Sequence, residues 1–230
     1  MEDRPLHRGF AEDIGTFANA FVTTRTAGFL KDMEICLTHT PNGAGGVTHA
    51  YFPALATCCA FLEYMTGLAR GRLNGTGWRE VAAWAARHLR QPDYSEATIR
   101  VLMEAFRNSV AHRGIATGIW RDRSDGGRET RRITWMLSEL GGTPACQLIE
   151  EAGVLERDPP WPCPYTHRMH IYLRSLADEL AAGARRYADT LLADADVQQR
   201  FENAMRTLYP RQRVAAEPRV RGGDKSRGQP

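Results

Sequence analysis

The chain contains 230 residues, of which 43% are hydrophobic and 25% are charged, and its formal net charge is +3. This length suits one large domain, and the composition excludes an intrinsically disordered protein. The longest apolar runs fall well short of the ~20 residues of a membrane-spanning helix, and the first residues do not resemble a secretory signal. The five cysteines lack the spacing of a disulfide framework. We therefore expect a cytoplasmic protein with no membrane partner.

The excess positive charge lies at the end of the chain. Residues 211–230 contain six cations and two acids, a net charge of +4, so residues 1–210 carry a net charge of about −1. The segment 211–230 has Val214 and Val220 as its only large aliphatic residues, which are too few to form a core. The sequence predicts a folded domain over residues 1–210 and a disordered basic tail over residues 211–230.

Hydrophobic residues at spacings of three and four predict helices along most of the chain. The first helix covers about Glu12 to Leu37, and the second begins near Pro53, where the missing N–H of proline does no harm. The second helix is apolar on two sides, so we expect it to be buried between neighbours. Glu63 is its one acid, and it is either a satisfied core carboxylate or a residue at the flank.

The clearest helical pattern lies in the middle of the chain. After a helix that ends near Leu89, Ser95 is predicted as the N-cap of the next helix and Gly114 as its terminator. The apolar stripe of this helix consists of Ile99, Leu102, Met103, Phe106 and Val110. We refer to the predicted helix between Ser95 and Gly114 as the motif helix.

The pattern changes after the motif helix. Apolar residues alternate with their neighbours over residues 115–121 and 133–137, on either side of a loop rich in Asp and Gly, which predicts a β-hairpin. A third short strand is predicted around residues 146–149. Two more helices follow, and their apolar stripes contain Met169, Tyr172, Leu173, Leu176, Leu180, Tyr187 and Leu191 in the first and Val197, Phe201, Met205 and Leu208 in the second. The predicted fold is therefore all-α, a helical bundle with a small β-hairpin insertion at about residues 115–150.

Two patterns resemble ligand sites without completing them. The glycine-rich segment 40–47 lacks the Lys-Ser/Thr of a phosphate-binding loop, so it is interpreted as a connection and no cofactor is predicted. Cys163, His167 and His170, with Cys146 as a fourth donor, offer the donor types of half a zinc site. A paired CxxC is missing, and surface or capping histidines explain the same residues, so no metal is predicted.

The end of the motif helix carries a second pattern, FRNSVAHRG at residues 106–114. Arg107 is followed at once by Asn108, and His112 closes the amphipathic helix after small residues. This pattern resembles the HEPN superfamily, all-helical domains of toxins, phage-defence nucleases and RNA-processing factors. Their signature is an Arg, a polar residue and a His four to six residues after the Arg. The resemblance extends over about residues 10–210 and implies a HEPN-like helical domain over residues 1–210.

The resemblance also implies a function and partners. It implies a HEPN-type, metal-independent endoribonuclease of a stress-response or phage-defence system, with RNA as substrate and Arg107, Asn108 and His112 as catalytic residues. An antitoxin or other defence-system protein is an implied partner. Family members regulated by a nucleotidyltransferase antitoxin carry a Tyr two residues after the His, whereas this chain has Gly114 there, which argues against that form of regulation.

Helix geometry adds an expectation about how these residues act. Asn108 and His112 lie about 40° apart around an ideal helix, so the amide can fix the imidazole tautomer. Arg107 and His112 lie about 140° apart, so a single helix does not direct both at one phosphate. A homodimer would supply Arg and His from two copies to one site. The alternative is a non-catalytic HEPN-like module for dimerisation or for binding a partner or nucleotide, in which Arg107 and His112 are structural.

Overall fold

The computed structural model describes the chain in nine stretches. They are residues 13–38, 40–41, 47–48, 50–90, 94–113, 118–123, 127–138, 141–156 and 160–209, with the side chains of 40–41, 47–48 and 111–113 excepted. The predicted basic tail, residues 211–230, and the predicted helix terminator Gly114 lie outside the described residues.

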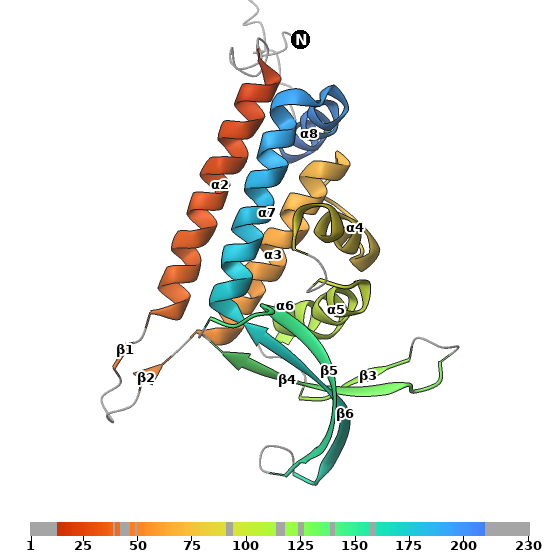
Figure 1. Cartoon of the computed structure of the whole chain (residues 1–230). Helices are drawn as coiled ribbons and strands as arrows, with labels where there is room; N and C mark the ends of the chain where they lie inside the picture. The colour runs from red at the N-terminus through yellow and green to blue at the C-terminus, as the bar shows by residue number, and fades with distance from the viewer. Residues whose placement is uncertain are drawn as a thin grey trace, which may run out of the picture.

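A bundle of long helices forms one end of the molecule, and a β-sheet covers the other end (Figure 1). The long helices are α2 (Ile14–Leu37), α3 (Tyr51–Arg70), α7 (Leu173–Ala193) and α8 (Ala195–Leu208). The shorter helix α4 (Trp78–His88) and the motif helix lie beside α3. Strands β1 (Thr40–Pro41) and β2 (Val47–Thr48) form a separate antiparallel pair in the connection between α2 and α3.

Helix α3 is the central helix of the bundle. It contacts α2, α7, α8 and the motif helix, and Leu55, Leu62, Met65 and Leu68 are at most 1% exposed. Its length and hydropathy would also suit a membrane span, but 56% of that apolar window is buried within the protein. Packing between neighbouring helices therefore accounts for its apolar character, as the two-sided apolar pattern predicts.

The four-stranded sheet contradicts the prediction of an all-α fold. Its strands are β3 (Trp120–Asp122), β4 (Arg131–Ser138), β5 (Cys146–Leu155) and β6 (Cys163–Tyr172), in the order β3-β4-β6-β5. The β4–β6 pair is parallel, whereas the two outer pairs are antiparallel. The fold is therefore a mixed α and β structure, and the predicted hairpin is only one edge of the sheet.

Strand β6 is the element that the sequence pattern misrepresented. Met169, Tyr172 and Leu173 continue the helical spacing of the apolar residues in α7, so the sequence predicts a helix that begins before Leu173. The structure instead follows the two-residue period of Tyr165, Met169 and Ile171, whose side chains are buried. Helix α7 begins only at Leu173, because β6 is paired on both sides and its backbone groups are satisfied by β4 and β5.

One face of the sheet, which we call the inner face, packs against the helices. Ile133 and Met169 on this face are fully buried. The ring of Trp135 lies edge-to-face against Phe52 of α3 and Phe106 of the motif helix, with ring centres 5.5 and 6.5 Å apart. The sheet thereby completes the hydrophobic core at the end of the bundle, which buries apolar area and supports the motif helix.

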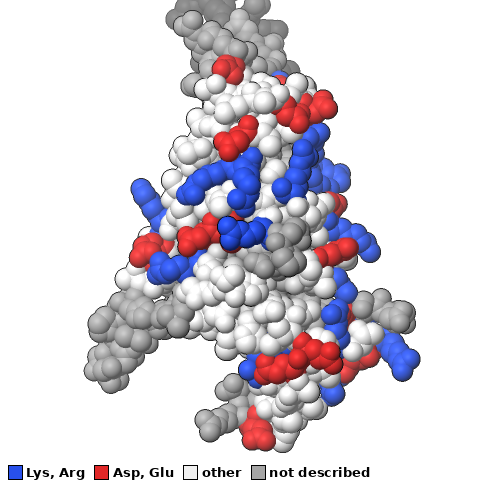
Figure 2. Space-filling model, in the orientation of Figure 1, with Lys and Arg blue, Asp and Glu red and all other residues white. Residues whose placement is uncertain are grey.

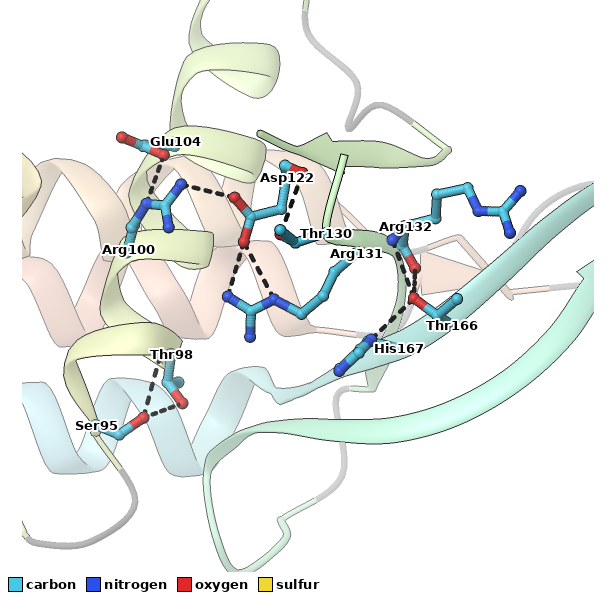
Figure 3. A network of polar contacts seen from close by, with 10 residues as sticks. All are labelled: Ser95, Thr98, Arg100, Glu104, Asp122, Thr130, Arg131, Arg132, Thr166 and His167. Carbon is cyan, nitrogen blue, oxygen red and sulfur yellow. Dashed lines mark hydrogen bonds and ion pairs between the residues drawn. The ribbon is translucent and has the colours of Figure 1, made fainter. Parts of the chain in front are cut away.

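A buried carboxylate ties the sheet to the motif helix (Figure 3). Asp122 of β3 is 0% exposed, and its oxygens accept hydrogen bonds from Arg100 Nη2 at 2.8 Å and from Arg131 Nη2 at 2.7 Å. The Arg100 guanidinium also lies over the rings of Trp78 and Trp120, 5.8 and 5.7 Å from their centres. Two cations thus compensate the buried charge of Asp122, and the cluster joins α5 to the β3–β4 hairpin.

We expect Asp122→Asn to lower the free energy of unfolding by about 3 kcal/mol, because it leaves Arg100 and Arg131 close together without their shared anion. Urea denaturation measures the change. Asp178→Asn, which removes a carboxylate exposed on α7, is the matched control and should change stability by less than about 0.5 kcal/mol. Equal effects of the two substitutions would show that the Asp122 cluster does not hold the sheet.

A second buried polar side chain, His88, lies in the helical bundle. It is 5% exposed, and its ring packs against Trp84 and Tyr187, with ring centres 5.0 and 5.6 Å away. Burial, reinforced by the positive charges of Arg87 and Arg186, lowers the pKa of His88 from 6.5 to about 4. The folded protein therefore holds this imidazole neutral.

Acid should therefore weaken the fold through His88. In the unfolded chain this side chain binds a proton near pH 6.5, whereas the folded chain resists protonation until about pH 4. The contribution of neutral His88 to the free energy of unfolding is complete above pH 6.5. About 3 kcal/mol of it should be lost as the pH falls to 4. Urea titrations across this range should show a smaller pH dependence for His88→Phe than for the unsubstituted protein. Parallel pH profiles would contradict the assignment.

Candidate functional site

The motif helix has an irregular turn immediately before the predicted site. It begins as α5 (Glu96–Val101), capped by Ser95, whose Oγ accepts from the Thr98 N–H at 3.2 Å as predicted. It continues as a π-helical stretch, η1 (Leu102–Arg107), and ends as α6 (Asn108–Arg113). A π-turn inserts an extra residue per turn and is often found at functional sites. Here it ends at Arg107, the first residue of the predicted site.

The guanidinium of Arg107 is held by Glu63 of α3. Arg107 Nε lies 3.0 Å from Glu63 Oε1, and Arg107 Nη2 donates to Glu63 Oε2 at 3.0 Å, so the contact is bidentate. The side chains are 35% and 22% exposed, respectively, which places the pair at the surface edge of the bundle. Glu63 is therefore a satisfied carboxylate at the edge of the core, and its partner is the predicted site arginine.

Asn108 makes the next contact with this guanidinium. Its Oδ1 accepts a hydrogen bond from Arg107 Nη1 at 3.0 Å, which leaves its Nδ2 as the group able to face His112. The backbone of His112 lies in α6, four residues after Asn108, but its side chain is outside the described residues. The predicted Asn108–His112 contact therefore stays a prediction.

Arg107 retains hydrogen-bonding capacity in this arrangement. A guanidinium has five N–H groups, and the contacts with Glu63 and Asn108 use three of them. Of the remaining two, one belongs to Nη1 and one to Nη2. Both can donate to phosphate oxygens, the acceptors for which arginine is well suited. The described contacts thus orient the guanidinium without using all of its donors.

The charge of the pair also affects the neighbouring Cys59, one turn earlier in α3. Burial is the main cause that raises the pKa of the Cys59 thiol to about 12, with a smaller contribution from the negative charge of Glu63 against the opposing effect of Arg107. Cys59 is therefore a protonated thiol at neutral pH and is neither a nucleophile nor a metal ligand here. The chemistry of this site rests on Arg107 and its neighbours in the motif.

The zinc pattern is not assembled. His167 and His170 lie three residues apart on β6, so their side chains point to opposite faces, whereas the sequence pattern placed them on a helix. Cys163 is four strand residues, about 13 Å, from His167. In the described part of the chain, no three His, Cys, Asp or Glu side chains are grouped as metal ligands. His167 Nδ1 instead lies 2.9 Å from Thr166 Oγ1 (Figure 3).

A pocket of about 750 Å³ is lined by the β3–β4 hairpin and by the end of the β5–β6 hairpin. We call it the outer-face pocket because Arg121, Arg132 and Thr134 lie on the strand face opposite to Ile133, although the inner-face residue Trp135 also lines it. Arg121, Arg132 and Trp161 are among its lining residues. Alternation over residues 115–121 places residues 119 and 121 on one face of a predicted strand, whereas the sequence pattern predicts no strand or helix around Trp161. The pocket forms only because the missed strand β6 brings that segment beside β3 and β4.

Acidic and basic side chains are interspersed over the face of the molecule shown in Figure 2, in agreement with the near-neutral charge of residues 1–210. No family model, curated protein or solved structure matches the chain. Function is therefore inferred from the local geometry of the Arg107 site and from the motif that resembles the HEPN superfamily.

The bidentate geometry predicts a measurable coupling between Arg107 and Glu63. In a double-mutant cycle of Arg107→Ala and Glu63→Gln, we expect a coupling free energy of about 1 kcal/mol from urea denaturation. The Arg174–Glu34 pair, whose side chains are 48% and 65% exposed, is the control and should give a coupling near zero. A coupling no larger than that of the control would mean that Glu63 does not hold Arg107 in solution.

Proposed function

We propose that the protein is a HEPN-type, metal-independent endoribonuclease of a stress-response or phage-defence system, which cleaves RNA at a composite site between two copies of the chain. The observation that carries the proposal is the orientation of Arg107 by Glu63 and Asn108, with two N–H groups that the contacts among described residues leave for a phosphate. The guanidinium is partly exposed and lies at the start of the short helix that contains His112.

The proposed reaction uses the 2′-hydroxyl of the RNA as nucleophile. Its oxygen forms a bond to the adjacent phosphorus while the bond from phosphorus to the 5′-oxygen of the next nucleotide breaks. One histidine removes the 2′ proton or protonates the leaving 5′-oxygen, and Arg107 stabilises the charge on the non-bridging oxygens. The products are a 2′,3′-cyclic phosphate and a 5′-hydroxyl.

The backbone geometry supports the composite site. Residues 108–113 are α-helical, and Arg107 is the last residue of the π-helical stretch before them. On an ideal α-helix, the five-residue spacing of Arg107 and His112 corresponds to about 140° around the axis. Two copies related by a two-fold axis can bring an arginine and a histidine to the same phosphate from opposite sides. Each chain would then contribute half of a site.

The direct test is incubation of the purified full-length chain with total RNA in EDTA. We expect cleavage with cyclic phosphate ends, a dimer mass by light scattering, and a loss of at least about 100-fold in rate for His112→Ala and Arg107→Ala. Arg90→Ala, which removes an exposed arginine at the end of α4 (77% exposed), should cleave normally. Activity that persists in both motif variants would contradict the proposal.

Mixing the two inactive variants tests the composite site. If each site needs Arg107 from one chain and His112 from the other, a heterodimer of Arg107→Ala and His112→Ala keeps one intact pair and recovers part of the activity. No recovery after verified subunit exchange would show that the pair acts within one chain or that both copies of each residue are required.

One observation favours a second function, a non-catalytic HEPN-like module for dimerisation or for binding a partner protein, such as an antitoxin, or a nucleotide. Glu63 neutralises Arg107, as expected of a structural ion pair between α3 and the motif helix. In that case the unsubstituted chain leaves RNA intact, and Arg107→Ala and Glu63→Gln destabilise the fold by similar amounts. The RNA assay and the double-mutant cycle together separate the two functions.

A further inference from the structure

The outer-face pocket has two walls that come from different parts of the sheet. Arg121 of β3 and Arg132 of β4 are paired in register, so their side chains lie side by side on the same face. Thr134 extends this wall. The opposite wall is the end of the β5–β6 hairpin, with Leu155 and the segment 161–164. The volume of about 750 Å³ lies in the usual range of ligand pockets, about 300–1,000 Å³.

The charge of the pocket is positive. Arg121 and Arg132 are the charged residues among its described lining, with side chains 64% and 36% exposed. Glu129 lies outside the lining, 3.6 Å from Arg121 Nη1 and 3.5 Å from Arg132 Nε. Both contacts are long and exposed to solvent, so they contribute little and an incoming phosphate can replace them. Two guanidinium groups are therefore available to an anionic ligand.

The opposite wall presents an aromatic ring. Trp161 is 67% exposed, and it lies between Pro160 and Pro162, whose fixed φ angles restrict the backbone on either side. An exposed indole held by a stiff segment loses little conformational entropy when a ligand stacks on it. The pocket thus combines one flat ring with two phosphate-binding side chains.

We propose that the outer-face pocket binds single-stranded RNA, with a base stacked on Trp161 and the adjoining phosphates on Arg121 and Arg132. Stacking on an aromatic ring together with arginine contacts to the backbone is how single strands are bound without sequence preference. Duplex RNA is disfavoured because its bases are already stacked on one another. This inference rests on the proposed function, since it names the substrate class and a second contact for the same reaction.

The pocket and the motif site consist of different residues but share a support. Arg107 is not among the described lining of the pocket, whereas Trp135 is, and the ring of Trp135 also packs against Phe106, the neighbour of Arg107. An RNA bound in the pocket must extend beyond it to reach Arg107, so it must be longer than one nucleotide. Affinity should therefore rise with strand length, and a mononucleotide should bind weakly.

The test is fluorescence anisotropy with a labelled 2′-O-methyl oligoribonucleotide of about twelve nucleotides, long enough for stacked contacts and a backbone groove. Because its 2′-oxygens are blocked, cleavage does not interfere. Trp161→Ala should weaken binding about 10-fold, the range expected for one lost stacking contact. The Arg121→Ala/Arg132→Ala double variant should weaken binding and reduce its salt dependence by about two phosphate contacts. Glu129→Gln should tighten binding.

Matched controls separate this pocket from the rest of the surface. Tyr209→Ala removes another exposed aromatic side chain, and Arg90→Ala another exposed arginine (54% and 77% exposed). Both should bind the probe normally. Unchanged affinity in Trp161→Ala and in the double arginine variant would overturn the inference, as would equal affinity for a duplex of the same length or preference for an acidic peptide.

The outcomes also separate this inference from the proposed function. Binding that depends on Trp161 without any cleavage of natural RNA would support the pocket as an RNA site and reject the nuclease. Cleavage with unchanged KM in Trp161→Ala, together with unchanged probe binding, would support the nuclease and reject the pocket. If both hold, Trp161→Ala should raise KM with little change in kcat, because Trp161 contributes to binding and takes no part in the proposed chemistry.

Discussion

The burial of the Asp122 carboxylate between Arg100 and Arg131 joins the two halves of this molecule. Without it, two guanidinium groups from the motif helix and from β4 would face each other at the junction of bundle and sheet. The Asp122 carboxylate fixes β3 against α5, and the neighbouring strand β4 then places Trp135 against Phe106 of the motif helix. A buried charge of this kind is costly unless it is compensated, so the arrangement has few alternatives.

The motif helix is therefore held from two sides. The sheet supports it through Arg100 and Phe106, and α3 holds its last turns through the Glu63–Arg107 pair. The π-turn between these contacts accommodates both, because one additional residue changes which side chains face the sheet and which face α3. Arg107 thus has a defined orientation before any ligand is bound, which is the condition for stabilising charge in a transition state.

The proposed RNA site and the motif site make different demands on their arginines. Arg107 is held in a bidentate contact with Glu63, so it offers a fixed orientation of its N–H groups more than net positive charge. Arg121 and Arg132 are more exposed and offer positive charge to a ligand. The net charge of residues 1–210 is near zero, so the proposed binding of RNA depends on local clusters of cations and not on the overall field. An exposed ring at Trp161 beside two such arginines satisfies that requirement within one pocket.

The sequence by itself determined the long helices, the Ser95 cap and the buried nature of α3, because helical period and capping are local properties of the chain. It also located Arg107 and Asn108 as candidate residues. The sheet depends on tertiary structure. The apolar residues of β6 fit both a helical spacing and the two-residue spacing of a strand, and pairing with β4 and β5 selects the strand. The same reason applies to the sites. Glu63 contacts Arg107 across 44 residues, and Trp161 and Arg121 line one pocket only because their strands belong to the same sheet. Contacts between segments distant in sequence depend on tertiary packing, and a local sequence pattern does not predict them.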